Sequence, residues 1–258
     1  MIKLGKRLFY LNTNSNWLIF ILLIIIYGIF TRMFLENISM ENQVQYNFWD
    51  IFFGIHADIF FLMYILIPVW IVISLKIITD EWNPNILIRL SSYKNWLIHN
   101  LINSIHYTLV IQGLIIACSW SISFQFPIEN QWSTYSQLNI STKEMSLSNN
   151  TPLYFAIIQI LYLSLFFISS FLFLALVFQF LQKKIWLYGL GFVMYISILI
   201  LYKYTFDYYY LNVINYMSVL NSYKIFPSLI YPFLFYLILL MVILLVGRLK
   251  NDTKESIF

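Results

Sequence analysis

Residues 79–96 read TDEWNPNILIRLSSYKNW, and this polar stretch separates two apolar runs that are each long enough to cross a membrane. Asn83 is a good helix-capping residue, and Pro84 suits the first helical position, where its missing N–H would have no partner. We therefore predict a short helix with one apolar face, formed by Ile86, Leu87 and Leu90. The charged residues around that face are Asp80, Glu81, Arg89 and Lys94. Such a helix either lies on lipid headgroups or docks onto a partner protein.

The composition of the chain points to a membrane environment. Of its 258 residues, 61% are hydrophobic and only 10% are charged, whereas a soluble domain averages about 25% charged residues. No stretch between the apolar runs is long enough for a separate folded unit. We therefore predict an all-α, polytopic membrane protein in which residues 1–258 form one transmembrane domain.

Six apolar runs are close to the roughly 20 residues that a helix needs to cross a bilayer. They lie at about 17–33, 59–78, 97–124, 153–181, 185–204 and 229–249. Pro68, near the middle of the second run, predicts a kink there. Residues 1–16 carry three basic residues among leucines, which predicts an interfacial amphipathic helix. No small-residue cleavage site follows it, so we expect this segment to be retained.

The distribution of Lys and Arg predicts that both termini are cytoplasmic. With the N-terminus inside, 11 of the 15 basic residues fall on inner segments, and the four on outer segments are Arg32, Lys143, Lys203 and Lys224. The three outer segments differ in character. Residues 34–58 are acidic, and the Ser/Asn-rich residues 125–152 are expected to form a solvated loop. The aromatic residues 203–228 are expected to form short helices at the outer interface that dip into the membrane.

The sequence offers little for catalysis or metal binding. It contains no G-x-x-x-x-G-K-[ST] motif for nucleotide phosphates and no G-x-S-x-G nucleophile motif. His99 and His106 are seven residues apart with no glutamate between them, and His56 belongs to the opposite side of the membrane. The lone Cys118 excludes an intramolecular disulfide. We therefore expect no catalytic residue, no metal site and no cofactor on this chain, and the net charge of +4 is no argument for nucleic-acid binding.

Ionisable residues near the predicted spans are candidates for a substrate path or an outer gate, because charges are costly in a bilayer. Asp58 stands at the outer end of the second run, with His56 within one turn of it. Lys203 and Asp207 are four residues apart on a helix and are expected to pair. The alternative for all four is an interfacial position or a local ion pair without further function.

This arrangement resembles the permease subunits of type-2 ABC exporters, which are six-span bacterial proteins with both ends inside. The resemblance covers the whole chain in layout and is carried mainly by residues 79–96. The family often has an acidic residue there, then an apolar helix with an arginine, then an aromatic residue opening span three, here Trp96. A second point is Asn221-Ser222-Tyr223 through Phe226-Pro227-Ser228, where the family carries outer helices. Tyr223 joins the outer-gate candidates for this reason.

The resemblance implies that the short inner segment is a coupling helix that docks into a groove of a separate ATPase subunit. Ile86, Leu87 and Leu90 would anchor it, while Asp80, Glu81 and Arg89 would set the charge register at the rim. ATP would be bound by that partner, and a second permease chain, identical or related, would complete the substrate path. The expected location is the bacterial cytoplasmic membrane.

Three functions remain open at this point. The first is the permease of an ABC exporter for an amphipathic or hydrophobic substrate, such as an antimicrobial peptide. The second is an immunity protein that binds a toxin at the outer surface without turnover, to which the aromatic segment 203–228 points. The third is a transporter driven by an ion gradient, or an intramembrane enzyme, against which the scarcity of acidic residues inside the spans argues.

Overall fold

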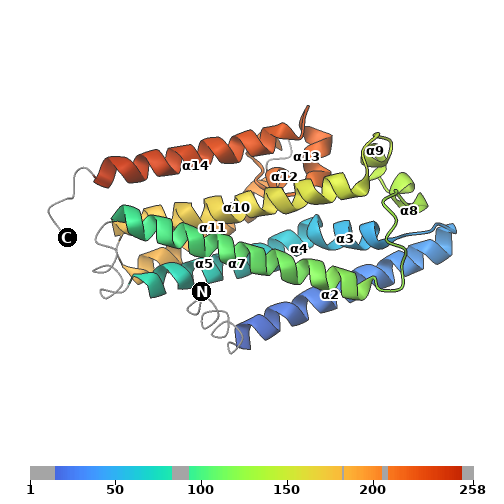
Figure 1. Cartoon of the computed structure of the whole chain (residues 1–258), viewed down its shortest axis with the longest axis horizontal. Helices are drawn as coiled ribbons and strands as arrows, with labels where there is room; N and C mark the ends of the chain where they lie inside the picture. The colour runs from blue at the N-terminus through green and yellow to red at the C-terminus, as the bar shows by residue number, and fades with distance from the viewer. Residues whose placement is uncertain (1–14, 83–92, 182, 205–208, 252–258) are drawn as a thin grey trace.

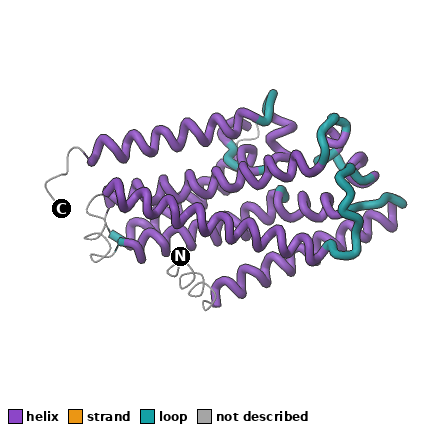
Figure 2. Tube along the Cα trace, viewed as in Figure 1, coloured by secondary structure: helices purple, strands orange, loops and turns teal. Residues whose placement is uncertain are grey.

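The structure, a computed structural model, describes residues 15–82, 93–181, 183–204 and 209–251. Throughout these ranges the chain forms helices and connecting loops, with no strand (Figure 2). The all-α prediction is therefore confirmed for this part of the chain. The predicted amphipathic helix at residues 1–16 falls almost wholly outside it.

Six helical segments make up the body of the fold. The first is α2 (Ser15–Asn42). The second is an interrupted segment made of α3 (Phe48–His56), α4 (Ile59–Phe61), η1 (Leu62–Leu66) and α5 (Ile67–Glu81). The other four are α7 (Tyr93–Ile122), α10 (Pro152–Leu181), α11 (Lys184–Tyr204) and α14 (Ile230–Asn251). The shorter elements are α8 (Thr134–Leu138), α9 (Lys143–Ser146), η2 (Tyr209–Leu211), α12 (Ile214–Met217) and α13 (Val219–Ile225). Figure 1 shows the long helices lying side by side, with α8, α9, α12 and α13 gathered at one end. We call this end the cap end.

Five helical segments in the part of the chain with described structure are long and apolar enough to cross a membrane. They are Leu18–Asn42, Phe48–Asp80, Asn95–Ile122, Pro152–Leu181 and Lys184–Tyr204. A sixth span is formed if α13 and α14, which meet at an angle of 107°, count as one broken span. The fold is thus compatible with a multi-pass membrane protein of five to six spans.

Helix α10 forms the centre of the bundle. It packs on α7, α14, α11, α3 and α5, and its sequence is apolar on nearly all sides, as is typical of a helix surrounded by others. Fully buried residues along its length include Phe155, Phe167 and Phe178. By contrast, α2 and α11 expose most of their apolar side chains and lie at the periphery. These exposed faces are available to lipid or to a second protein.

The structure corrects the predicted ends of the first two spans. Helix α2 continues to Asn42, nine residues beyond the predicted end, and the second apolar segment already starts at Phe48. Residues 34–58 are therefore mostly helical, and α3 is buried against the bundle. Two of its acidic residues are used within the fold, since Asp50 and Asp58 each accept a hydrogen bond from the backbone at the start of a helix.

The second segment is irregular just before Pro68. The π-helix Leu62–Leu66 lies there, and Pro68 lacks the N–H that would bond the carbonyl of Tyr64 in a regular α-helix. The distortion that Pro68 predicts thus takes the form of a π-turn. Whether the helix axis also bends there stays a prediction.

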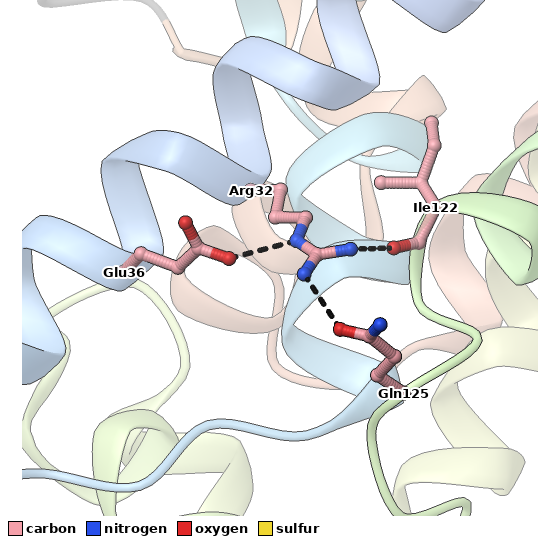
Figure 3. Close-up of polar contacts among 4 residues, drawn as sticks. All are labelled: Arg32, Glu36, Ile122 and Gln125. Carbon is pink, nitrogen blue, oxygen red and sulfur yellow. Dashed lines mark hydrogen bonds and ion pairs between the residues drawn. The ribbon is translucent and has the colours of Figure 1, made fainter.

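Arg32 connects α2 to the end of α7 at the cap end. Its Nε donates to Glu36 Oε1 at 2.8 Å, and its Nη1 and Nη2 donate to the carbonyl of Ile122 at 3.0 Å and to Gln125 Oε1 at 3.2 Å (Figure 3). Its guanidinium carbon also lies 5.1 Å from the ring centre of Phe126. An arginine that the charge count treats as an outer-loop residue is in fact a helix-to-helix clamp.

We expect Arg32→Lys to lower the free energy of unfolding by about 1–2 kcal/mol, because one ammonium cannot bond three acceptors in one plane. Thermal unfolding of the purified chain in detergent measures this. The charge and the predicted topology are unchanged in this variant. Lys143→Gln is the control, since Lys143 is an exposed basic residue at the same end, and an equal loss in both variants would contradict the clamp.

Candidate functional site

The Ser/Asn-rich segment 127–151 is docked onto the bundle, and we call it the cap. It contains α8 and α9, and its Met145 is 1% exposed, packed in a cluster with residues of α3 and α10. The hydrogen bonds that attach it are Trp49 Nε1 to the Glu129 carbonyl (2.8 Å), Asn47 Nδ2 to the Gln131 carbonyl (2.8 Å) and Tyr135 N to the Gln45 carbonyl (3.0 Å). The expectation of a solvated loop holds for most of its residues, which are exposed, but the segment is also anchored to the bundle through its buried residues Ser133, Ser136, Thr142 and Met145.

Asp50 connects the cap to the first turn of α3. Its Oδ2 accepts from the backbone N of Asn47 at 2.8 Å, which completes a capping box with the Asn47 side chain. Its Oδ1 accepts from the hydroxyl of Ser136 on α8. With 5% of its surface exposed, Asp50 has both oxygens occupied by partners from two segments.

A pocket of about 450 Å³ lies between α2, α3 and the cap. We call it the cap pocket. Most of its wall is apolar and aromatic, and includes Tyr27, Phe30, Phe34, Phe53 and Phe60. Its polar lining comes from the cap, through Tyr135, Asn139 and Thr142, and from the carboxylates Asp50 and Asp58. None of the described residues that line it is basic.

Tyr135 stays a neutral hydrogen-bonding residue at the edge of this pocket. Burial and then the nearby charge of Asp50 raise its pKa, and its hydroxyl accepts from Asn139 Nδ2 at 2.8 Å. The pKa of Tyr46, in the loop before α3, is raised as well: burial and then the charge of Glu36 raise it to about 12. Neither phenol therefore adds a negative charge near neutral pH.

Asp58 is the pocket carboxylate with one oxygen that accepts no hydrogen bond from the described residues. Its Oδ1 accepts from the backbone N of Phe61 at 3.0 Å, as the cap of α4, and from the hydroxyl of Tyr27 on α2. Its Oδ2 has no hydrogen bond in the part of the chain that the structure describes, and the side chain is partly exposed. The prediction that Asp58 stands at a functional position thus has a geometric basis.

His56 does not join Asp58 in this pocket. Its ring is completely buried and is stacked on Phe52, with 4.1 Å between ring centres. Both ring nitrogens lack a hydrogen-bond partner among the residues described. The pairing of His56 with Asp58 on one path is therefore not what the structure shows: His56 packs in the core of α3.

Of the remaining outer-gate candidates, Lys203 and Tyr223 are not among the residues that line the cap pocket. Lys203, near the end of α11, has its Nζ 5.3 Å from the ring centre of Tyr204. Its predicted partner Asp207 lies outside the described residues. Tyr223 on α13 packs edge-on against Phe155 of α10, with 5.4 Å between ring centres, and is half-buried. Tyr223 is thus a packing residue in this conformation.

Sequence reasoning missed the residue that holds α12 and α13 against the bundle. Gln159 of α10 is fully buried, and its Nε2 donates to the carbonyls of His56 (2.8 Å) and Met217 (3.0 Å). Its Oε1 accepts from the backbone N of Val219 at 2.7 Å. The signal was present, since Gln159 is an amide inside a long apolar run and such residues need partners in a bilayer.

At the opposite end, only the edge of the predicted coupling helix is described. Asp80 is exposed in the last turn of α5, and Glu81 is the last residue of that helix. Ile86, Leu87, Arg89 and Leu90 lie outside the described residues. Trp96 is fully buried, and its ring meets that of Trp82 edge-on at 5.1 Å. Trp96, in the first turn of α7, therefore packs the N-terminal end of α7 against the C-terminal end of α5.

The part of the chain with described structure contains no group of three or more His, Cys, Asp or Glu side chains placed to hold a metal ion. The sequence matches no family model, and no curated protein or solved structure is significantly similar to it. The site must therefore be interpreted from its own geometry.

Proposed function

We propose that this chain is the membrane-spanning permease subunit of an ATP-driven ABC exporter. Its substrate is amphipathic or hydrophobic, such as an antimicrobial peptide. ATP is bound and hydrolysed by a separate subunit, and a second permease chain completes the path. The chain itself is a transport subunit rather than an enzyme, and its place is the bacterial cytoplasmic membrane, with both termini inside.

The observation that supports this proposal is the arrangement of α12 and α13, the short helices that precede α14. Helices α12 and α13 are inserted among the long helices, where Ile214, Met217 and Val219 are fully buried, and α13 meets α14 at 107°. They lie at the cap end, opposite the C-terminal end of α5 and the N-terminal end of α7 (Figure 1). A folded-in segment before the last span, at the end away from the junction of α5 and α7, is the layout expected of such a permease.

The surfaces of α2 and α11 fit the same proposal. Large apolar residues such as Leu18, Phe30, Ile185 and Phe192 are more than half exposed on these two helices. In a bilayer this area contacts lipid, and part of it is available for a second permease chain. Lys76, Asp80, Lys183 and Lys184 gather as exposed charges at the end proposed to face the ATPase.

The experiment is a pull-down of the tagged chain in mild detergent, with partners identified by mass spectrometry. We expect a nucleotide-binding ATPase to co-purify and Leu87→Asp to lose it at least tenfold, because a charge in the apolar face blocks docking into a groove. Ser92→Asp is the matched control, since it adds the same charge on the face of the predicted helix opposite to Ile86, Leu87 and Leu90.

A chain that purifies without an ATPase from wild-type membranes would overturn the exporter proposal. Co-purification that Leu87→Asp and Ser92→Asp reduce equally would support the ATPase as a partner but contradict the assigned coupling face. Correct insertion of both variants is checked by their amount in the membrane fraction.

The cap pocket favours one second candidate, an immunity protein that binds a toxin at this end without turnover. A partly enclosed pocket with aromatic walls is suited to bind part of a peptide whether or not an ATPase is attached. Protection of cells that persists after every neighbouring ATPase gene is deleted would favour this candidate. An ion-gradient transporter stays the third hypothesis, with Asp58 as the carboxylate it would use.

A further inference from the structure

We propose that the cap pocket binds the primary ammonium group of an amphiphile, with Asp58 as the counter-ion and the aromatic wall around its apolar chain. The observation behind this proposal is a partly exposed carboxylate with one unoccupied oxygen, inside an apolar pocket that no basic residue of the described chain lines.

The position of Asp58 narrows the class of ligand. It lies between α3, which ends at His56, and α4, which begins at Ile59, inside an apolar segment that is long enough to cross a membrane. A hydrophilic cation would lose its hydration among the aromatic side chains of this pocket, whereas the ammonium group of an amphiphile is carried there by its own apolar chain. A carboxylate in such surroundings favours a cation that replaces its lost water.

The basic residue that α2 places next to the pocket-lining Thr31 is directed elsewhere. Arg32 lies on the same helix as Tyr27 and Phe34, but its three hydrogen bonds go to Glu36, Ile122 and Gln125 (Figure 3). It is not among the residues that line the pocket. In the described part of the chain, Asp58 thus has no basic partner, and its carboxylate is open to a ligand.

The aromatic wall supplies the second half of the site. Phe30, Phe34 and Phe60 are each at least 60% exposed beside the pocket, so an apolar chain can lie along α2 from the bilayer side. Tyr27 contributes its ring to the wall and its hydroxyl to Asp58. Aromatic faces also attract an ammonium group directly. The shape thus accepts one ammonium and one apolar chain together.

The interpretation of this site as the entry point of an exported substrate rests on the proposed function. Binding itself is measured on the purified chain in phosphatidylcholine nanodiscs without an ATPase, so its failure and the failure of ATPase co-purification are separate results. The probe is a photoreactive dodecylamine, and labelled peptides are located by mass spectrometry. We expect label in residues 27–35 and 53–64, with competition by dodecylamine at least about tenfold stronger than by dodecanol.

Three variants separate charge from shape. Asp58→Asn removes the charge but keeps an equally good cap for α4, and we expect at least tenfold less label. Tyr27→Phe breaks the hydrogen bond to Asp58 but keeps the charge, and we expect label at the wild-type level or above. Glu129→Gln removes an exposed carboxylate of the cap outside the pocket and is expected to change nothing.

Two results would overturn the proposal. One is equal labelling of Asp58→Asn and the wild type, or equal competition by dodecanol and dodecylamine, which would show an apolar surface without charge recognition. The other is an equal loss in Tyr27→Phe and Asp58→Asn, which would show that the contact between α2 and α4 matters for structure rather than for the ligand.

Discussion

Replacing Gln159 by leucine is expected to destabilise the protein by about 3–5 kcal/mol, because a side chain of similar size then leaves three backbone groups without partners in a dry interior. These groups are the carbonyls of His56 and Met217 and the N–H of Val219. The loss should be local as well as global, since α12 and α13 have Gln159 as a shared anchor. The midpoint of thermal unfolding in detergent and the amide exchange of residues 212–225 measure the two effects.

Two further variants test this account of Gln159. Ser164→Ala is the control on the same helix, since the Ser164 hydroxyl donates only to the carbonyl of Ile160 within its own helix. We expect less than about 0.5 kcal/mol from it. Gln159→Glu keeps an acceptor for Val219 but loses the donors to the two carbonyls and buries a carboxyl group beside them, so we expect a loss at least as large as in Gln159→Leu. If the Val219 amide stays as protected in Gln159→Leu as in the wild type, the anchoring role of this side chain is wrong.

The apolar runs predicted the long helices well because a bilayer leaves the backbone few alternatives to helix. The runs at 153–181 and 185–204 match α10 and α11 within one residue at each end. The prediction of short helices within 203–228 is also confirmed, by α12 and α13, while their place at the outer membrane interface stays a prediction. There the mixture of aromatic and polar residues was informative, since such a segment fits neither water nor lipid alone.

The prediction was incomplete where polar residues satisfy partners within the protein. Residues 34–58 and the cap contain Asp, Asn, Ser and Thr whose partners the sequence does not show, and Asp50 and Ser136 bond each other across 86 positions of the chain. Composition reports that a segment is polar but not where its hydrogen bonds go. The cap pocket could not be predicted for the same reason, since its wall joins α2, α3 and the cap only after the cap docks.

Replacing Asp50 by alanine is expected to release the cap, with a loss of about 2–4 kcal/mol in the free energy that holds it to α3. The Ser136 hydroxyl and the Asn47 N–H would lose their acceptor in a buried position, and α3 would lose half of its capping box. Exchange of amide hydrogens in residues 127–151 and cleavage of this segment by added protease measure the release. Asp50→Asn, which keeps the shape and one acceptor, should give a smaller change, and Glu129→Gln should give none.

The same variant shows whether the cap belongs to the ligand site. Asp58 and the aromatic residues of α2 are intact in Asp50→Ala, but the variant also removes the charge of Asp50 from the pocket. Asp50→Asn removes the same charge, so a change in amine labelling beyond that of Asp50→Asn comes from the wall that the cap provides through Tyr135, Asn139 and Thr142. We expect labelling to fall severalfold, because an open wall lets water reach Asp58 and weakens its attraction for an ammonium group. Unchanged labelling with a released cap would mean that Asp58 and α2 suffice, and the cap would then be a structural cover rather than part of the site.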